Sequence, residues 1–150
     1  MTRKYIVEFN KDFKGLCCVG VLYNGHRCGY VGVPISHPLY NFHYTDKLPK
    51  EILYYWEKVK TKPVGKRGVI DIFCCDLSNP HVGIIFDVHG GITFAASNEN
   101  NYPIVTDKKL WFFGFDCNHY DDFDKPKSQK YVEKECKNLA KQLIEINKGE

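Results

Sequence analysis

Long apolar segments are what this 150-residue sequence most clearly lacks. Its longest uninterrupted apolar run, Leu16 to Tyr23, is far shorter than the roughly 20 residues that a helix needs to span a bilayer. The first residues also contain no apolar stretch of signal-peptide length. We therefore expect a protein with no membrane partner, located in the cytoplasm.

No Cys-x-x-Cys pair occurs, although the chain has seven cysteines. That absence argues against a zinc ribbon, a zinc finger or a thioredoxin-type redox site. An odd number of cysteines in a cytoplasmic protein indicates reduced thiols rather than a disulfide framework. We expect all seven thiols to be free.

Arginine is scarce, and the charge has no strong sign. Only three arginines occur, and 21 basic residues nearly balance 18 acidic ones, for a net charge of +3. This excludes the dense basic surface of a protein that binds duplex nucleic acid. Walker loops, nucleophile-elbow motifs and dinucleotide fingerprints are also absent, so no cofactor is expected. An anionic ligand would have to be small and bound in a local pocket.

Aromatic residues, by contrast, are abundant: ten Tyr, ten Phe and two Trp. One small core uses fewer rings than this. Tyr and Trp offer flat, rigid contact area at little entropic cost. The surplus therefore predicts an aromatic groove or interface.

Apolar periodicity predicts several strands and two helices. Asn24-Gly25 is a strong hairpin signal. Gly90-Gly91 marks a second turn. The expected strands are Lys4–Phe9, Leu16–Tyr23, Cys28–Pro34, Val69–Cys75, Val82–His89, Ile92–Ala96 and Leu110–Phe115. A first helix is expected from Pro49 to Lys60, where apolar residues recur at helical spacing.

The clearest element is a C-terminal amphipathic helix. Its apolar stripe consists of Val132, Cys136, Leu139, Leu143 and Ile146, and Ser128 is the expected N-cap. Because such a stripe must be buried, the helix should lie across one face of the sheet. We predict a single α+β domain over residues 1–150, an antiparallel β-sheet with this helix and one further helix packed on it.

Polar residues gather in two short stretches. Asp116, His119 and Asp122 follow the last strand, and Asp87 and His89 would share one face of an earlier strand. If the two stretches adjoin, they supply two imidazoles and three carboxylates, enough to bind a divalent metal or to perform acid–base chemistry. The alternative is that these residues cap turns and satisfy backbone groups. No known metal spacing is present, so no metal is assigned.

A third stretch, Gly29 to Tyr40, combines glycines with aromatic and histidine residues. In a ligand groove, Tyr30 and Tyr40 would stack on a flat base while Arg27 and His37 contact a phosphate. Alternatively, the glycines mark a bulged or edge strand, and the charges are solvated surface groups.

Four segments together resemble a small family of phage and prophage proteins that usually carry no assigned function. They are Gly29–Tyr40, Val88–Phe94, Trp111–Asp122 and Tyr131–Cys136, and the resemblance covers residues 28 to 145. Short phage proteins of this kind often counter host defence. The resemblance therefore implies that the chain sequesters a nucleotide immune signal, cyclic or of the ADP-ribose type.

Three functions follow as hypotheses. The first is an anti-defence protein that binds a small nucleotide, alone or as a homo-oligomer, through Arg27, Tyr30, His37, Tyr40, His89, Asp116, His119 and Asp122. The second is a metal-dependent hydrolase or phosphodiesterase that uses the imidazoles and carboxylates. The third is an inhibitor that binds a host defence protein through exposed rings.

Overall fold

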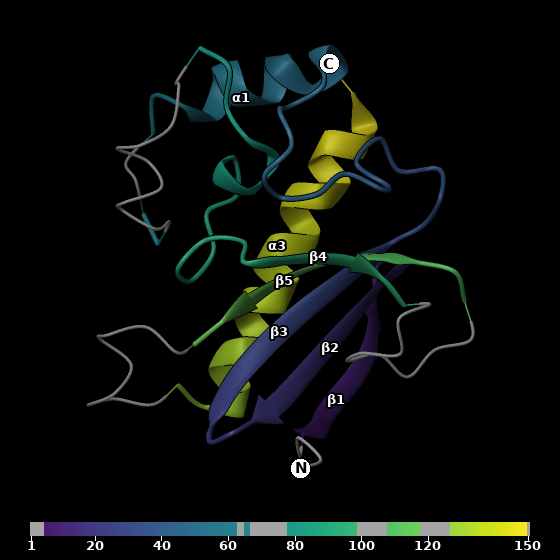
Figure 1. Cartoon of the computed structure of the whole chain (residues 1–150), viewed down its shortest axis with the longest axis vertical. Helices are drawn as coiled ribbons and strands as arrows, with labels where there is room; N and C mark the ends of the chain where they lie inside the picture. Colours follow the sequence, from purple (N-terminus) through teal and green to yellow (C-terminus); the bar gives the residue numbers. More distant parts are fainter. Residues whose placement is uncertain (1–4, 63–64, 67–77, 99–107, 118–126, 150) are drawn as a thin grey trace.

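The computed structural model describes residues 5–62, 65–66, 78–98, 108–117 and 127–149. Its centre is an antiparallel sheet of five strands in the order β1-β2-β3-β5-β4 (Figure 1). The strands are β1 (Tyr5–Phe13), β2 (Leu16–Tyr23), β3 (His26–Val33), β4 (Phe94–Ser97) and β5 (Trp111–Asp116). The predicted antiparallel sheet is therefore confirmed.

The β2–β3 hairpin forms where the sequence predicted it. Asn24 and Gly25 both have a positive φ, 49° and 84°. A two-residue hairpin turn requires these angles when its backbone twist is to match that of the two strands it joins. This turn places Tyr23 opposite His26 at the end of the ladder. The first strand is longer than predicted, because β1 pairs with β2 as far as Phe13, with a register shift between Val7 and Phe9.

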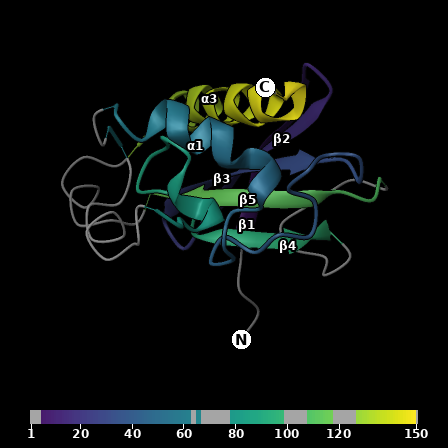
Figure 2. The ribbon, with the colours of Figure 1, turned by 90° about the horizontal axis from the view of Figure 1, so that it is seen from above.

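The C-terminal helix α3 (Gln129–Lys148) begins at the predicted cap, where the Ser128 hydroxyl accepts a hydrogen bond from the Tyr131 N–H. The whole predicted apolar stripe is buried. A 3₁₀ turn, η1 (Lys50–Ile52), leads into the shorter helix α1 (Leu53–Val59). Both helices lie on the same side of the sheet (Figure 2). The two-layer α+β architecture is confirmed.

The two faces of the sheet carry separate apolar clusters. The larger one lies between the sheet and the helices. The smaller one lies on the opposite face and contains Val19, Val21, Cys28, Tyr30, Leu110 and Phe112. On the helix side, Gly29 permits a close approach: a Cβ there would lie 2.4 Å from the Phe115 ring and 2.8 Å from Cys136 Sγ. Helix α3 thus packs directly onto the strand backbone.

The prediction of a strand over Val82–His89 is wrong. Residues 82–84 form a 3₁₀ turn, η2 (Val82–Ile84), and the rest of the segment is irregular. Side chains of α3 take the place of a partner strand: Gln142 Oε1 accepts from the Asp87 N–H at 3.0 Å, and Asn138 Nδ2 donates to the Asp87 carbonyl at 2.8 Å. Because these side chains bond the backbone N–H and carbonyl of Asp87, the buried apolar segment does not have to pair with a strand.

The remaining predictions differ from the structure mainly at their boundaries. Strand β4 begins two residues later than expected, and β5 is shifted by one residue. Gly90 and Gly91 turn the chain with φ of 69° and 82°. The strand predicted at residues 69–75 lies outside the described residues. No helix in the described ranges is long and apolar enough to cross a membrane.

Candidate functional site

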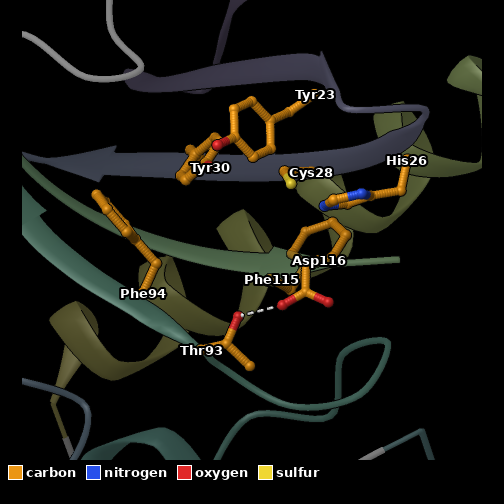
Figure 3. Close-up of a pocket in the computed structure, with 8 residues that line it drawn as sticks. All are labelled: Tyr23, His26, Cys28, Tyr30, Thr93, Phe94, Phe115 and Asp116. Atoms are coloured by element: carbon orange, nitrogen blue, oxygen red, sulfur yellow. Dashed lines mark hydrogen bonds between the residues drawn. The ribbon is translucent and has the colours of Figure 1, made fainter. Parts of the chain in front are cut away.

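A pocket of about 230 Å³ lies on the sheet face that α3 leaves uncovered (Figure 3). We call it the sheet pocket. The β2–β3 hairpin forms one side, and the β4–β5 pair with the residue before β4 forms the other. It is lined by Tyr23, His26, Cys28, Tyr30, Thr93, Phe94, Phe115 and Asp116.

One end of the sheet pocket is aromatic. The Tyr30 and Phe94 rings meet edge to face, with centroids 5.1 Å apart and planes at 83°. Gly114 makes room for Tyr30, because a Cβ there would lie 2.5 Å from Tyr30 Cδ1. Tyr23 stands beside this pair in Figure 3 and meets the His26 ring edge to face at 5.8 Å. These rings offer flat surface at right angles to one another.

The other end of the sheet pocket is polar. Asp116, the last residue of β5, accepts a hydrogen bond from the Thr93 hydroxyl at 2.9 Å. His26 lies at the same end of the pocket (Figure 3). Cys28 is paired with Asp116 across the ladder. Burial raises the pKa of the Cys28 thiol to about 11, so the thiol is protonated at neutral pH.

Because side chains alternate between the two faces of β3, the Arg27 side chain points away from the sheet pocket. It forms an ion pair that stabilises the fold. Its Nε donates to Glu8 Oε1 at 2.8 Å, and a second guanidinium nitrogen donates to Glu8 Oε2 at 3.2 Å. A third contact goes to the Lys127 carbonyl at 2.9 Å. A fork-to-fork pair of this kind fixes the guanidinium. Arg27 therefore ties β1 and β3 to the start of α3, away from the pocket lining.

His37 is buried, with 4% of its surface exposed. Its Nδ1 accepts from the Leu39 N–H at 3.0 Å, so the proton of the neutral ring sits on Nε2, which donates to the Leu143 carbonyl at 2.8 Å. The imidazole thus joins the loop after β3 to α3. This contact does not place His37 in the sheet pocket.

Protonation of His37 is expected to destabilise the fold. Burial lowers its pKa below the ordinary value near 6.5, so the folded protein binds this proton less readily than the unfolded chain. The neutral His37 ring contributes its full stabilisation above pH 6.5. As the pH falls from there towards the pKa of the folded protein, the free energy of unfolding decreases by at most about 1.4 kcal/mol per pH unit. Urea unfolding between pH 7.5 and 5 checks this. His37→Asn should make the free energy of unfolding less dependent on pH. His43→Asn, which changes an exposed residue, is the control and should not have this effect.

Tyr40 packs on the other side of the sheet from Tyr30. Its ring lies against Trp111, with centroids 6.3 Å apart, and Trp111 packs on the larger cluster beneath the helices. Tyr30 belongs to the smaller cluster on the opposite face. The structure therefore does not bring Tyr30 and Tyr40 into one groove.

Asp87 and His89 face α3 rather than the sheet pocket. His89 Nδ1 lies 2.9 Å from the Tyr131 hydroxyl, and its backbone N–H donates to Glu135 Oε2 at 3.1 Å. Asp87 accepts from the Lys66 N–H at 2.7 Å. Sequence reasoning missed Glu135, which is 2% exposed and pairs with Lys66 Nζ at 2.6 Å. This network secures the segment before β4 to the helix.

In the part of the chain that the structure describes, no three His, Cys, Asp or Glu side chains gather in a metal-binding arrangement. His119 and Asp122 lie outside the described residues. Of the predicted ligand residues that the structure describes, Tyr30 and Asp116 line the sheet pocket.

Most of the pocket lining was not singled out from the sequence. Tyr23, His26, Cys28, Thr93 and Phe94 line the pocket beside the two predicted residues. The Asn24-Gly25 hairpin signal does indicate part of this lining. Once Asn24-Gly25 fixes the register, strand alternation places Tyr23, Cys28 and Tyr30 on one face.

Comparisons of the chain with protein-family models, curated proteins and solved structures gave no match. Its function is therefore inferred from the chemistry of the site itself.

Proposed function

We propose that this protein binds and sequesters a nucleotide signal, with the base of the nucleotide held in the sheet pocket. The observation that carries the proposal is the composition of the pocket, which joins four Tyr and Phe residues to the Asp116 carboxylate and the Thr93 hydroxyl. Flat rings bind a nucleobase by stacking and edge contacts, and the polar end can read its hydrogen-bonding edge.

The segments that resemble phage proteins support the same site. Tyr30 comes from the first of them, Thr93 and Phe94 from the second, and Phe115 and Asp116 from the third. They are far apart in the chain, and the pairing of β3, β5 and β4 brings them to one pocket. In the proposed role, a phage would use this pocket to remove an immune signal from the host cytoplasm.

The size of the sheet pocket favours one ring system. Pockets that enclose a whole drug-sized ligand usually measure about 300–1,000 Å³. At about 230 Å³, this one would hold a base and leave the sugar and phosphates outside. Tight capture of a dinucleotide would then require two copies of the chain, which is the homo-oligomeric form of the first hypothesis.

Capture without turnover also agrees with the chemistry at the pocket. Its thiol, Cys28, is kept protonated by burial and is a poor nucleophile. The hydrolase alternative relies on Asp87, His89, Asp116, His119 and Asp122 with an added metal, and the release experiment below separates the two functions.

The protein is expected to lower the free concentration of a nucleotide and to return it chemically intact. The measurement mixes the protein with guanine and adenine mono-, cyclic and cyclic dinucleotides, removes protein-bound ligand by ultrafiltration, and releases it by heating. Chromatography should recover the starting compound, because binding uses ground-state contacts alone. A product that forms only with added divalent metal would instead identify a hydrolase.

Phe94→Ala is expected to weaken capture by about 1–3 kcal/mol, the usual effect of removing one aromatic platform. Phe94 is half-buried at the pocket and lies on an edge strand, so the variant should fold. Tyr40→Ala is the matched control, since it removes a half-buried ring on the other side of the sheet. Isothermal titration should show weakened binding for Phe94→Ala only; equal losses would contradict the pocket assignment.

A further inference from the structure

We infer that Asn24 is a site of spontaneous covalent modification, at which the side-chain amide is lost and the β2–β3 turn is converted to isoaspartate. The inference rests on the chemistry of the Asn24-Gly25 turn and does not require the proposed function. Asparagine is among the thermolabile residues of proteins. Its loss depends on the structure around the following backbone nitrogen, so the asparagines of this chain can be compared with one another.

The reaction joins the Gly25 backbone nitrogen to Cγ of the Asn24 side chain. The backbone nitrogen gives its proton to a solvent base and forms the new bond, the side-chain nitrogen takes up a proton and leaves as ammonia, and a succinimide ring remains. Water then opens this ring at one of its two carbonyls. One opening gives aspartate, and the other gives isoaspartate, whose main chain runs through the former side chain. The whole reaction takes up water and releases ammonia.

The Asn24-Gly25 turn leaves both reacting groups accessible. Both residues are exposed, and within the described part of the chain neither the Asn24 amide nor the Gly25 N–H forms a hydrogen bond. Gly25 has no side chain to shield its nitrogen, and even a Cβ built there would meet no atom within 4 Å. Ring closure requires Asn24 to leave its turn conformation, and exposed loops with few packed contacts open locally at low free-energy cost.

Asn41 is the closest comparison, because it is also exposed and has a positive φ of 72°. The next backbone N–H, that of Phe42, is engaged: it donates to the Leu39 carbonyl at 3.1 Å. The phenylalanine side chain also crowds the nitrogen that would attack. Asn41 should therefore react more slowly than Asn24.

The other asparagines of the described chain each lack one of the required conditions. Some hold their side chains in hydrogen bonds, one precedes a proline, whose nitrogen carries no proton, and one lies within α3. In that order they are Asn10, Asn98 and Asn138, then Asn79, then Asn147.

Isoaspartate at Asn24 would displace one wall of the sheet pocket. It adds a carbon to the main chain of a two-residue turn, whose geometry is matched to the twist of the strands it joins. The longer turn no longer fits the register in which Tyr23 lies opposite His26. These two residues line the sheet pocket, and their rings meet edge to face at 5.8 Å (Figure 3). The new carboxylate also lowers the net charge of +3 by one.

The experiment incubates the full chain at mildly alkaline pH and maps aspartate and isoaspartate by peptide mass spectrometry. Asn24 should convert about tenfold or more faster than Asn41, a difference of about 1.4 kcal/mol in activation free energy. Asn24→Gly is the matched control variant, because Gly-Gly also suits this turn. Ion-exchange chromatography should show a more acidic form that accumulates in the wild-type protein and not in Asn24→Gly.

Two-dimensional NMR of the acidic form should show its largest amide shifts at Tyr23 and His26. Trp111, at the opposite end of the β3–β5 pairing, should be unchanged. Absence of conversion at Asn24, equal conversion of Asn41, or an acidic form that accumulates equally in Asn24→Gly overturns the inference. Isoaspartate at Asn24 with unshifted Tyr23 and His26 signals overturns the displacement of the pocket wall.

Discussion

Leu139→Ala is expected to lower the free energy of unfolding by about 2–5 kcal/mol. Leu139 is completely buried in the middle of α3, where that helix packs on β2 and β3. Truncation would remove apolar contact and leave a cavity that the strand backbone beneath cannot fill by moving.

Chemical denaturation monitored by circular dichroism measures the loss. Lys141→Ala, an exposed position two residues further along α3, is the control and should change stability by no more than about 0.5 kcal/mol. A loss of that small size for Leu139→Ala would show that α3 is peripheral and would contradict the two-layer core.

Lys66→Met is expected to cost about 3 kcal/mol, near the lower end of the range for a broken buried ion pair. Glu135 is 2% exposed, and Lys66, whose side chain is half-exposed, supplies its countercharge at 2.6 Å. Without Lys66 the buried carboxylate keeps, within the described part of the chain, its hydrogen bond from the His89 N–H. The half-exposed position of the lysine explains why the larger values in that range are not expected.

Two further variants isolate the cause. Lys66→Met/Glu135→Leu should be more stable than Lys66→Met alone, because it removes the unpaired charge as well. Lys58→Met breaks the pair with Glu145, in which both side chains are exposed, and should cost at most about 1 kcal/mol. Equal urea-unfolding midpoints for Lys66→Met and Lys58→Met would show that burial of Glu135 has no energetic consequence.

Local signals in the sequence predicted the elements that depend on local physics. The stripe from Val132 to Ile146 and the Ser128 cap predicted α3, and Asn24-Gly25 predicted the β2–β3 turn with its positive φ angles. These features depend on residues within a few positions of one another.

The segment from Val82 to His89 shows where local reasoning fails. Its apolar residues look like a strand, but Asn138 and Gln142 of α3, about fifty residues away in sequence, bind its backbone instead. The sheet pocket depends in the same way on the pairing of β3 with β5 and of β5 with β4. Spacing within the sequence predicted neither pairing, so Tyr30 and Asp116 were identified without Thr93 and Phe94.

Strand β4 is four residues long and, among the strands that the structure describes, lies at the edge of the sheet and pairs with β5 alone. Edge strands this short open locally at low free-energy cost. Phe94 and the preceding Thr93 supply one wall of the sheet pocket, and the hairpin supplies the other. A base bound between the two walls binds only the closed form, so mass action shifts the edge strand towards pairing. Under the proposed function, ligand binding would therefore be thermodynamically linked to local opening of the edge strand, and the ligand would stabilise the pairing of β4 with β5.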